Sequence, residues 1–217
     1  MPPPRFQDWL TPTPQGLYCA GGDFFIDPPH PVDKAVITHG HSDHARAGHG
    51  AVLATAETIE VMKVRLGADC AGNLQALALS EHLTIRDVTI SLRPAGHILG
   101  SAQVVIEHKG QRAVVSGDYK RAADPTCAPF ELVPCGLFIT EATFGLPVFR
   151  HELADKEVAK LLASVRRFPE RTHLVGVYGL GKCQRLIMLL RRAGYDRPIW
   201  LHGVLVALCD LYRVLGI

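Results

Sequence analysis

The sequence predicts an α/β (α+β) protein in two regions, because the spacing of its apolar residues changes once along the chain. Before residue 150, short apolar runs alternate with glycine-containing turns, which is typical of strands joined by hairpins. After residue 150, apolar residues recur at i, i+3, i+4 and i+7, which is typical of amphipathic helices. We therefore expect one domain over residues 1–148 and a second over residues 149–217.

In the first region, each expected element is a short apolar run bounded by turn residues. We expect a hairpin from residues 17–19 and 24–26, strands at residues 35–37 and 52–54, a helix at residues 57–66, a second hairpin from residues 104–107 and 113–115, and a strand at residues 137–139.

In the second region, helical and strand patterns alternate. Helices are expected around residues 158–165, 186–193 and 204–215, with strands at residues 173–178 and 198–201. A β-α-β-α order favours a parallel α/β layer. A layer with only these two strands would leave a sheet edge uncovered. We therefore expect the chain to be a piece of a longer protein.

Composition excludes several classes of protein. With 47% hydrophobic and 20% charged residues among 217, the chain can bury a large core, which excludes disorder as its main state. Its net charge of +2 argues against a strongly basic nucleic-acid-binding tail. The six scattered cysteines lack any C-x-x-C pair, which predicts reduced thiols in a cytoplasmic protein. We expect no signal peptide at residues 1–5 and no membrane span.

The strongest chemical signal is the run His39-x-His41-x-Asp43-His44, which follows the expected strand at residues 35–37. Imidazole and carboxylate groups suit zinc, and also manganese or iron. A loop here can direct His39 and His41 to one ion while Asp43 and His44 face a neighbouring position. The alternative is a surface loop that is rich in histidine by chance.

Three further candidates lie at the ends of expected strands or in glycine turns. His97 is flanked by glycines, Asp118 follows the strand at residues 113–115, and Asp27 follows the strand at residues 24–26. Each residue alone is more often structural. Together they predict a dinuclear site, in which Asp118 bridges two cations and Asp27 orients a ligand.

These motifs resemble those of a known superfamily. The order of Asp27, the H-x-H-x-D-H run, His97 and Asp118 resembles motifs one to four of the metallo-β-lactamase superfamily. Residues 138–145 (FITEATFG) resemble motif A of its β-CASP nuclease branch. More narrowly, residues 94–103 (PAGHILGSAQ), 141–147 (EATFGLP) and 178–186 (YGLGKCQRL) resemble the bacterial DNA-ligase-associated exonuclease group.

The resemblance implies a fold and a set of site residues. Residues 1–148 would form the N-terminal part of the αββα metallo-β-lactamase sandwich, and residues 149–217 the start of an inserted β-CASP α/β domain. The implied ligands of two zinc ions, with manganese as the alternative, are His39, His41 and His97 for the first, Asp43 and His44 for the second, and Asp118 between them. Asp27 would support the ligand loop without binding a metal ion, and Glu141 would orient the leaving-group acid. The implied catalytic residues are Asp43, Asp118 and Glu141.

The implied activity is hydrolysis of DNA by an exonuclease, through a hydroxide activated by two zinc ions. The implied setting is DNA repair beside an ATP-dependent DNA ligase. Three alternatives stay open: an RNA-processing nuclease of the same superfamily, an inactive metal-binding or nucleic-acid-binding fragment, and a small-molecule hydrolase. The chain ends before the family's motifs B and C, so we expect an incomplete second metal site, and whether this chain is active stays open.

Residues 176–183 nearly match a phosphate-binding P-loop, but Cys183 stands where Ser or Thr would bind magnesium. We therefore do not expect binding of a nucleoside triphosphate. Lys182 and Arg185, at the start of the next expected helix, are candidate nucleic-acid contacts. The alternative for both residues is a solvated helix face.

Overall fold

Residues 5–217, which the computed structural model describes, contain two β-sheets and four α-helices, so the α+β class predicted from the sequence is confirmed. The chain divides into two units, Met1–Glu141 and Ala142–Ile217, whereas the sequence placed the boundary between residues 148 and 149. Residues 1–4, where no signal peptide was expected, lie outside the described residues.

The first sheet has its strands in the order β1-β2-β3-β4-β5-β6. Its strands are β1 (Leu10–Thr13), β2 (Gly16–Cys19), β3 (Phe24–Ile26), β4 (Lys34–Val36), β5 (His49–Ala54) and β6 (Ala71–Ala76). The predicted hairpin is confirmed, since β2 and β3 pair antiparallel with Leu17 opposite Ile26. From β3 to β6 the pairing is parallel. The sequence did not indicate β1 or β6, because Pro12 and Gly72 weaken the strand pattern.

The second sheet has the order β11-β10-β9-β8-β7. Its strands are β7 (His82–Ile85), β8 (Val88–Pro94), β9 (Ala102–His108), β10 (Gln111–Val115) and β11 (Leu137–Ile139). The predicted hairpin of β9 and β10 is confirmed. The hairpin of β7 and β8 was missed, because its turn places Arg86 at φ 51° without the glycine that signals such turns.

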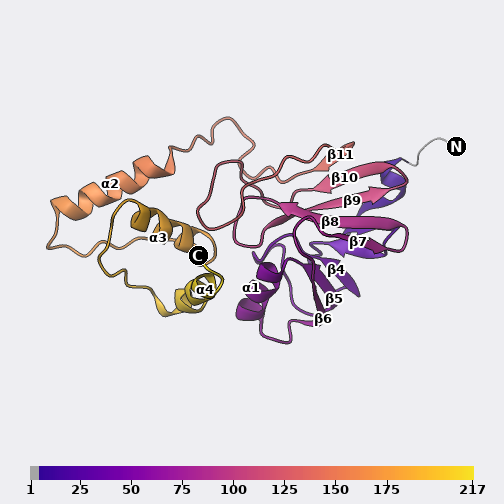
Figure 1. Cartoon of the computed structure of the whole chain (residues 1–217), viewed down its shortest axis with the longest axis horizontal. Helices are drawn as coiled ribbons and strands as arrows, with labels where there is room; N and C mark the ends of the chain where they lie inside the picture. The colour runs from indigo at the N-terminus through magenta and orange to yellow at the C-terminus, as the bar shows by residue number, and fades with distance from the viewer. Residues whose placement is uncertain (1–4) are drawn as a thin grey trace. The chain divides into compact units, whose positions relative to one another are not determined.

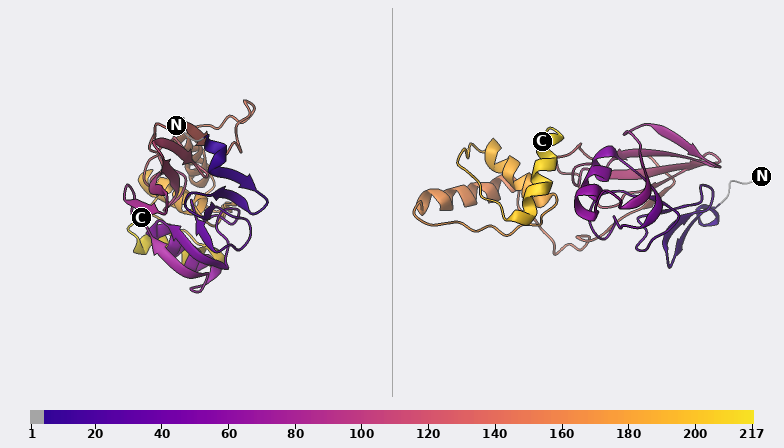
Figure 2. Two further views of the ribbon diagram at one scale, coloured as in Figure 1. Left: turned by 90° about the vertical axis from the view of Figure 1, so that its right-hand side faces the viewer. Right: turned by 90° about the horizontal axis from the view of Figure 1, so that it is seen from below.

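The two sheets pack face to face over one apolar core (Figures 1 and 2). That core takes side chains from both sheets: Leu10, Cys19, Phe24, Ile26, Val36 and Leu53 from the first, and Val88, Ile90, Leu92, Val104, Ile106, Ala113 and Val115 from the second. Helix α1 (Ala56–Leu66) covers the other face of the first sheet, where Ile59 and Met62 pack with Ile37 and Val52. Residues 5–141 thus form a helix–sheet–sheet sandwich.

No second outer helix lies among residues 5–141, although the resemblance implied one in the αββα sandwich. Beyond β10, a loop without helix or strand runs to β11, and part of it lies against the second sheet. Gln103 on β9 is buried, and its Nε2 atom donates to the carbonyl oxygen of Glu131 in this loop at 2.7 Å. The loop thus contributes to covering the second sheet.

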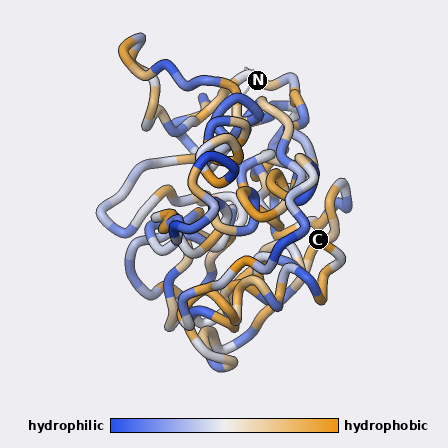
Figure 3. Tube along the Cα trace, turned by 90° about the vertical axis from the view of Figure 1, so that its left-hand side faces the viewer, coloured by the Kyte–Doolittle hydropathy of each residue, from blue (hydrophilic) through white to orange (hydrophobic). Residues whose placement is uncertain are grey.

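The second unit contains the three predicted helices, α2 (Ala154–Arg167), α3 (Lys182–Arg192) and α4 (Gly203–Val214). Val158 and Leu162 on α2 pack with Leu190 on α3. Figure 3 shows hydrophobic and hydrophilic positions interleaved along the helices, as expected of amphipathic helices. Among residues 5–217, no helix combines the length and the apolar character needed to cross a membrane.

The strands predicted at residues 173–178 and 198–201 do not form. Neither segment pairs with another strand among the described residues, and a strand exists only where its backbone groups find a partner. Leu174 and Trp200 are 93% and 92% exposed, so their apolar side chains bury no sheet face. The predicted parallel α/β layer is therefore wrong for residues 142–217.

Candidate metal centre

The carboxyl ends of several strands meet at one edge of the sandwich. Strands β3 and β4 are parallel, and β8, β10 and β11 share one direction because β8 and β10 both pair antiparallel with β9. The backbone N–H of Ala102 donates to the carbonyl oxygen of Thr38 at 2.8 Å, which links the two sheets there. The loops that follow these strands carry the candidate residues: Asp27 after β3, His39 to His44 after β4, His97 after β8, Asp118 after β10 and Glu141 after β11.

The first group of side chains is His39, His41, His97 and Asp118, whose possible ligand atoms all lie within 4.8 Å of one another. His41 Nδ1 lies 3.0 Å from His39 Nε2 and 3.1 Å from His97 Nε2. The Oδ2 atom of Asp118 lies 3.3 Å from His97 Nε2. His39 is fully buried, whereas the other three side chains are partly exposed, so the group opens to solvent on one side.

A second group consists of His44, Asp118 and Glu141. Asp118 takes part in both groups: its Oδ1 lies 3.7 Å from His44 Nε2, and its Oδ2 faces the first group. Asp43, the ligand predicted for a second ion, lies outside both groups, with a side chain that is 75% exposed and a carboxylate 3.8 Å from His44 Nε2. The carboxylates of Asp43 and of the exposed Glu141 thus both lie near His44.

Asp27 supports the ligand loop through hydrogen bonds. Its Oδ1 accepts from the Thr38 N–H at 2.8 Å, and its Oδ2 accepts from the Thr38 hydroxyl at 2.6 Å. The same Oδ2 lies 2.7 Å from His44 Nδ1, an arrangement that leaves His44 Nε2 directed to Asp118. The sequence did not single out Thr38, whose Oγ1 lies 3.1 Å from His39 Nδ1. A threonine at a strand end carries no distinctive signal.

Burial and neighbouring charges set the protonation states in the site. Burial holds the pKa of His39 well below its ordinary value and lowers the pKa of His97 to about 4. Burial alone would also lower the pKa of His44, but the hydrogen bond and charge of Asp27 raise it to about 9. Burial raises the pKa of Asp118. Neutral His39 and His97 offer lone pairs at pH 7.

The donor set fits a divalent transition metal ion. Three imidazole nitrogens and one carboxylate oxygen converge in the first group, and zinc commonly takes histidine nitrogen and carboxylate oxygen as ligands. Imidazole also suits iron, and carboxylate oxygen suits manganese. The second group has one imidazole and two carboxylates, a set that is richer in oxygen.

Two glycines allow the ligand loops to approach each other. Gly117 has φ 53°, and a Cβ atom there would lie 2.5 Å from Thr38 Oγ1. Gly96 has φ 72°, and a Cβ atom there would collide with the carbonyl oxygen of Lys120. Both positions precede a candidate ligand, Asp118 and His97, so a side chain would displace that ligand.

The P-loop-like segment of the second unit is closed by its own side chain. Gln184 Oε1 accepts from the Gly181 N–H at 2.8 Å, and Gln184 Nε2 donates to the Gly179 carbonyl at 2.9 Å. These bonds occupy the turn that would cradle a phosphate. Of the candidate nucleic-acid contacts, Lys182 lies over the Tyr178 ring at 4.4 Å, and Arg185 is half-buried.

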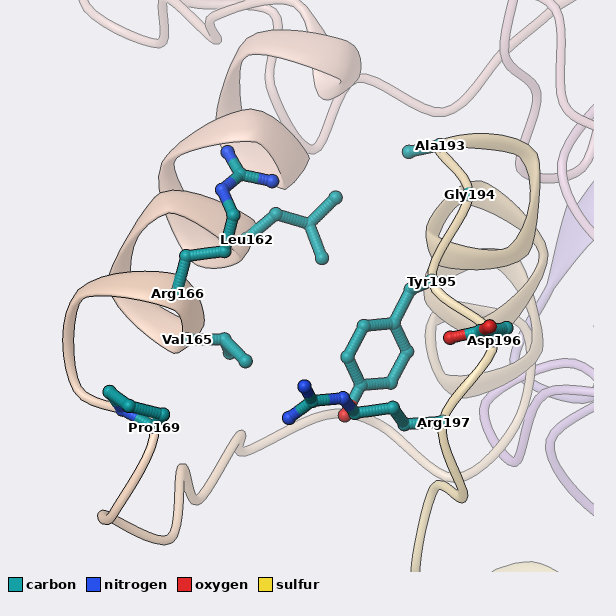
Figure 4. A pocket seen from close by; sticks show the side chains of 9 residues that line it. All are labelled: Leu162, Val165, Arg166, Pro169, Ala193, Gly194, Tyr195, Asp196 and Arg197. Atoms are coloured by element: carbon teal, nitrogen blue, oxygen red, sulfur yellow. The ribbon is translucent and has the colours of Figure 1, made fainter.

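The second unit also has a hollow of about 300 Å³ between α2 and the segment after α3. Figure 4 shows Leu162 and Val165 on α2 facing Tyr195 and Arg197 across it. It holds none of the candidate metal ligands, which all belong to the unit Met1–Glu141.

The sequence has relatives among curated proteins, although no family model matches it. A protein named probable DNA ligase from Opitutus terrae is 31% identical over 220 residues, which cover 96% of this chain and 20% of the relative. An endoribonuclease ysh-1 from Neurospora crassa is 28% identical over 223 residues, covering 83% of this chain and 26% of the relative. Both relatives are named as nucleic-acid enzymes. The chain spans about a fifth to a quarter of their length.

Among solved structures, a protein of unknown function from Enterococcus faecalis V583 has a similar fold, with a TM-score of 0.53 and 13% sequence identity. The match covers 85% of this chain and 49% of that protein. At this identity, the likeness concerns the fold alone.

Proposed function

We propose that this chain is the metal-binding part of a nuclease that hydrolyses phosphodiester bonds. The observation that carries the proposal is the convergence of His39, His41, His97 and Asp118 within 4.8 Å, in a chain similar to an endoribonuclease and a probable DNA ligase. The proposal includes the N-terminal part of the metallo-β-lactamase sandwich for residues 1–148 and the start of a β-CASP domain for residues 149–217.

Each site residue has a role in the proposal. His39, His41 and His97 hold one ion, and His44 with a carboxylate of Asp43 or Glu141 holds a second. Bound zinc or manganese ions supply Lewis acidity and a water that is activated at neutral pH. Asp118 faces both groups with its two oxygens. Asp27 keeps His44 in orientation, and the exposed Glu141 orients the leaving-group acid.

More narrowly, we assign the activity to a DNA exonuclease that works in DNA repair beside an ATP-dependent DNA ligase in the cytoplasm. The similarity to a protein named probable DNA ligase, over 96% of this chain, supports this substrate and partner. The similarity to an endoribonuclease favours an RNA-processing nuclease as the second candidate. Lys182 and Arg185 are the proposed nucleic-acid contacts in the second unit.

The test compares metal content and digestion for the chain and two variants. Elemental mass spectrometry should find at least one metal ion per wild-type chain, and two if the second group is complete. End-labelled DNA should shorten from its ends while an RNA of matched sequence persists. His41→Ala should lose metal and DNA cleavage, because His41 lies within 3.1 Å of two other ligand atoms. The exposed His30→Ala variant is the control and should retain both.

Other results would contradict parts of the proposal. Equal or faster cleavage of RNA would favour the RNA-processing nuclease over the DNA exonuclease. Full metal retention in His41→Ala would refute the ligand assignment. A chain that binds metal but cleaves neither polymer would favour a binding fragment.

A further inference from the structure

The N-terminal end of helix α1 holds the loop that carries His97. The hydroxyls of Thr55 and Thr58 donate to the carbonyl oxygen of Gly100 at 2.7 Å and 3.0 Å. Gly100 has φ 78°, and a Cβ atom there would lie 2.6 Å from the backbone nitrogen of Thr58. The helix end and the loop are therefore in direct contact, with no room for a side chain between them.

Hydrogen bonds within the loop connect this contact to His97. The hydroxyl of Ser101 accepts from the backbone N–H of His97 at 3.0 Å and of Ile98 at 3.1 Å. The Ser101 N–H in turn donates to the Ile98 carbonyl at 3.0 Å. Hydrogen bonds within this short loop hold its backbone together, so fixing the Gly100 carbonyl also restrains the backbone of His97.

The C-terminal end of the same helix holds the other ligand loop. Arg65 donates from Nη1 to the carbonyl oxygen of Gly40, the residue between His39 and His41. Gly40 is buried and Arg65 is half-buried, so water competes little for this bond. A charged donor makes a stronger hydrogen bond than a neutral one.

Between its two ends, α1 is held against the first sheet. Ile59 and Met62 are at most 5% exposed and pack with Ala35, Ile37 and Val52. A helix fixes the spacing of its ends, because each residue adds about 1.5 Å of length. The two ligand loops are therefore attached to one rigid element at a set separation.

We infer that α1 is a clamp for the metal centre, and that Thr55, Thr58 and Arg65 are positioning residues that set His97 against His39 and His41. None of the three supplies a ligand atom to either group. The inference rests on the proposed metal centre. If the contacts only stabilised the fold, removing one would change stability but leave metal affinity and coordination geometry unchanged in the folded chain.

The experiment is Co²⁺ titration of the full 217-residue chain. The variants are Arg65→Met, Arg65→Lys and Thr58→Val, with Lys63→Met as control. Lys63 lies on the same helix and forms a partly exposed ion pair with Glu60. Circular dichroism first establishes that each variant is folded. The readouts are Co²⁺ affinity, the d–d absorption spectrum, and the melting temperature of the metal-free chain.

Loss of a residue that orients a metal ligand costs about 10- to 100-fold in metal affinity. We expect Arg65→Met and Thr58→Val to weaken Co²⁺ binding by about tenfold or more and to shift the d–d band. Arg65→Lys should restore part of the affinity, because an ammonium group can also donate to the Gly40 carbonyl. Lys63→Met should match the wild type. Should Arg65→Met fail to fold, Thr58→Val carries the test, since valine keeps the shape of threonine.

Wild-type affinity and spectrum in both folded variants would overturn the clamp and leave the metal centre intact. No Co²⁺ binding by the wild-type chain would overturn the metal centre and the clamp with it.

Discussion

Asp27 accepts hydrogen bonds from Thr38 and His44 although its own backbone has φ 43°, a region that residues other than glycine rarely adopt. Aspartate and asparagine tolerate this region better than other side chains. The conformation places one carboxylate between the strand end and the ligand loop. A single side chain thus links β3 to two residues of the loop that follows β4.

The buried carboxylate of Asp124 should make the stability of the fold depend on pH. Burial would raise the pKa of Asp124, but hydrogen bonds from Lys120 and Thr126 hold it below its ordinary value. Its carboxylate therefore stabilises the fold above the pKa of the unfolded chain, about 3.9, and this stabilisation is lost as pH falls through the folded pKa. Asp124→Asn should cost about 1–3 kcal/mol at pH 7.

Urea unfolding of wild type and Asp124→Asn at pH 7, 5 and 3.5 measures this effect. The difference in unfolding free energy should be nearly constant from pH 7 to 5 and shrink toward pH 3.5. A difference that grows in acid would contradict the direction of the pKa shift. Exposed Asp69→Asn is the control.

The turn after β10 places Asp118 next to the loop that follows β4. Gly117 makes this possible, because a Cβ atom at that position would lie 2.5 Å from Thr38 Oγ1 and the backbone has φ 53°. The hairpin of β9 and β10 was predictable from its apolar runs and its turn. The close approach of Gly117, after the end of β10, to Thr38 was not predictable, because the two residues are far apart in sequence.

Gly117→Ala should therefore destabilise the chain by about 1–3 kcal/mol and reduce its metal content, since the backbone strain and the collision both act next to Asp118. Denaturant unfolding and elemental analysis measure the two effects. Gly110→Ala is the control for backbone strain, because Gly110 has φ 78° but no atom within 4 Å of its added Cβ. If Gly117→Ala and Gly110→Ala lose the same stability and both retain metal, close packing at Gly117 does not position Asp118.

Every candidate metal ligand belongs to one of the two units of the chain. Both groups of side chains lie within Met1–Glu141, whereas Lys182 and Arg185 lie within Ala142–Ile217. The first unit has its own core between two sheets and a helix on one outer face. Metal binding and the proposed nucleic-acid contacts are therefore separable along the chain.

A chain of residues 1–141 should fold and bind as many metal ions as the full chain. Circular dichroism, elemental analysis and Co²⁺ titration of the two chains test this expectation. If Lys182 and Arg185 contact phosphates, the shorter chain should bind DNA more weakly, and its DNA affinity should depend less on salt concentration. Loss of metal from folded residues 1–141 would show that the second unit contributes to the site.

The donor types and most of the secondary structure could be predicted from the sequence alone. The H-x-H-x-D-H run is local, so its spacing alone predicts a metal site, and the three helices of the second unit follow from periodicity within each segment. Strands at residues 173–178 and 198–201 were wrongly predicted, because an apolar run does not say whether a partner strand lies beside it.

The convergence of the candidate ligand side chains depends on how the strands and loops pack together. Glu141 lies near His44 and Asp118, because β10 and β11 are parallel and end at the same edge. The contact of Arg65 with the Gly40 carbonyl, 25 residues away in sequence, depends on how α1 packs on the sheet. Sequence spacing carries no information about contacts of this kind, since they arise when separate strands and loops meet at one edge.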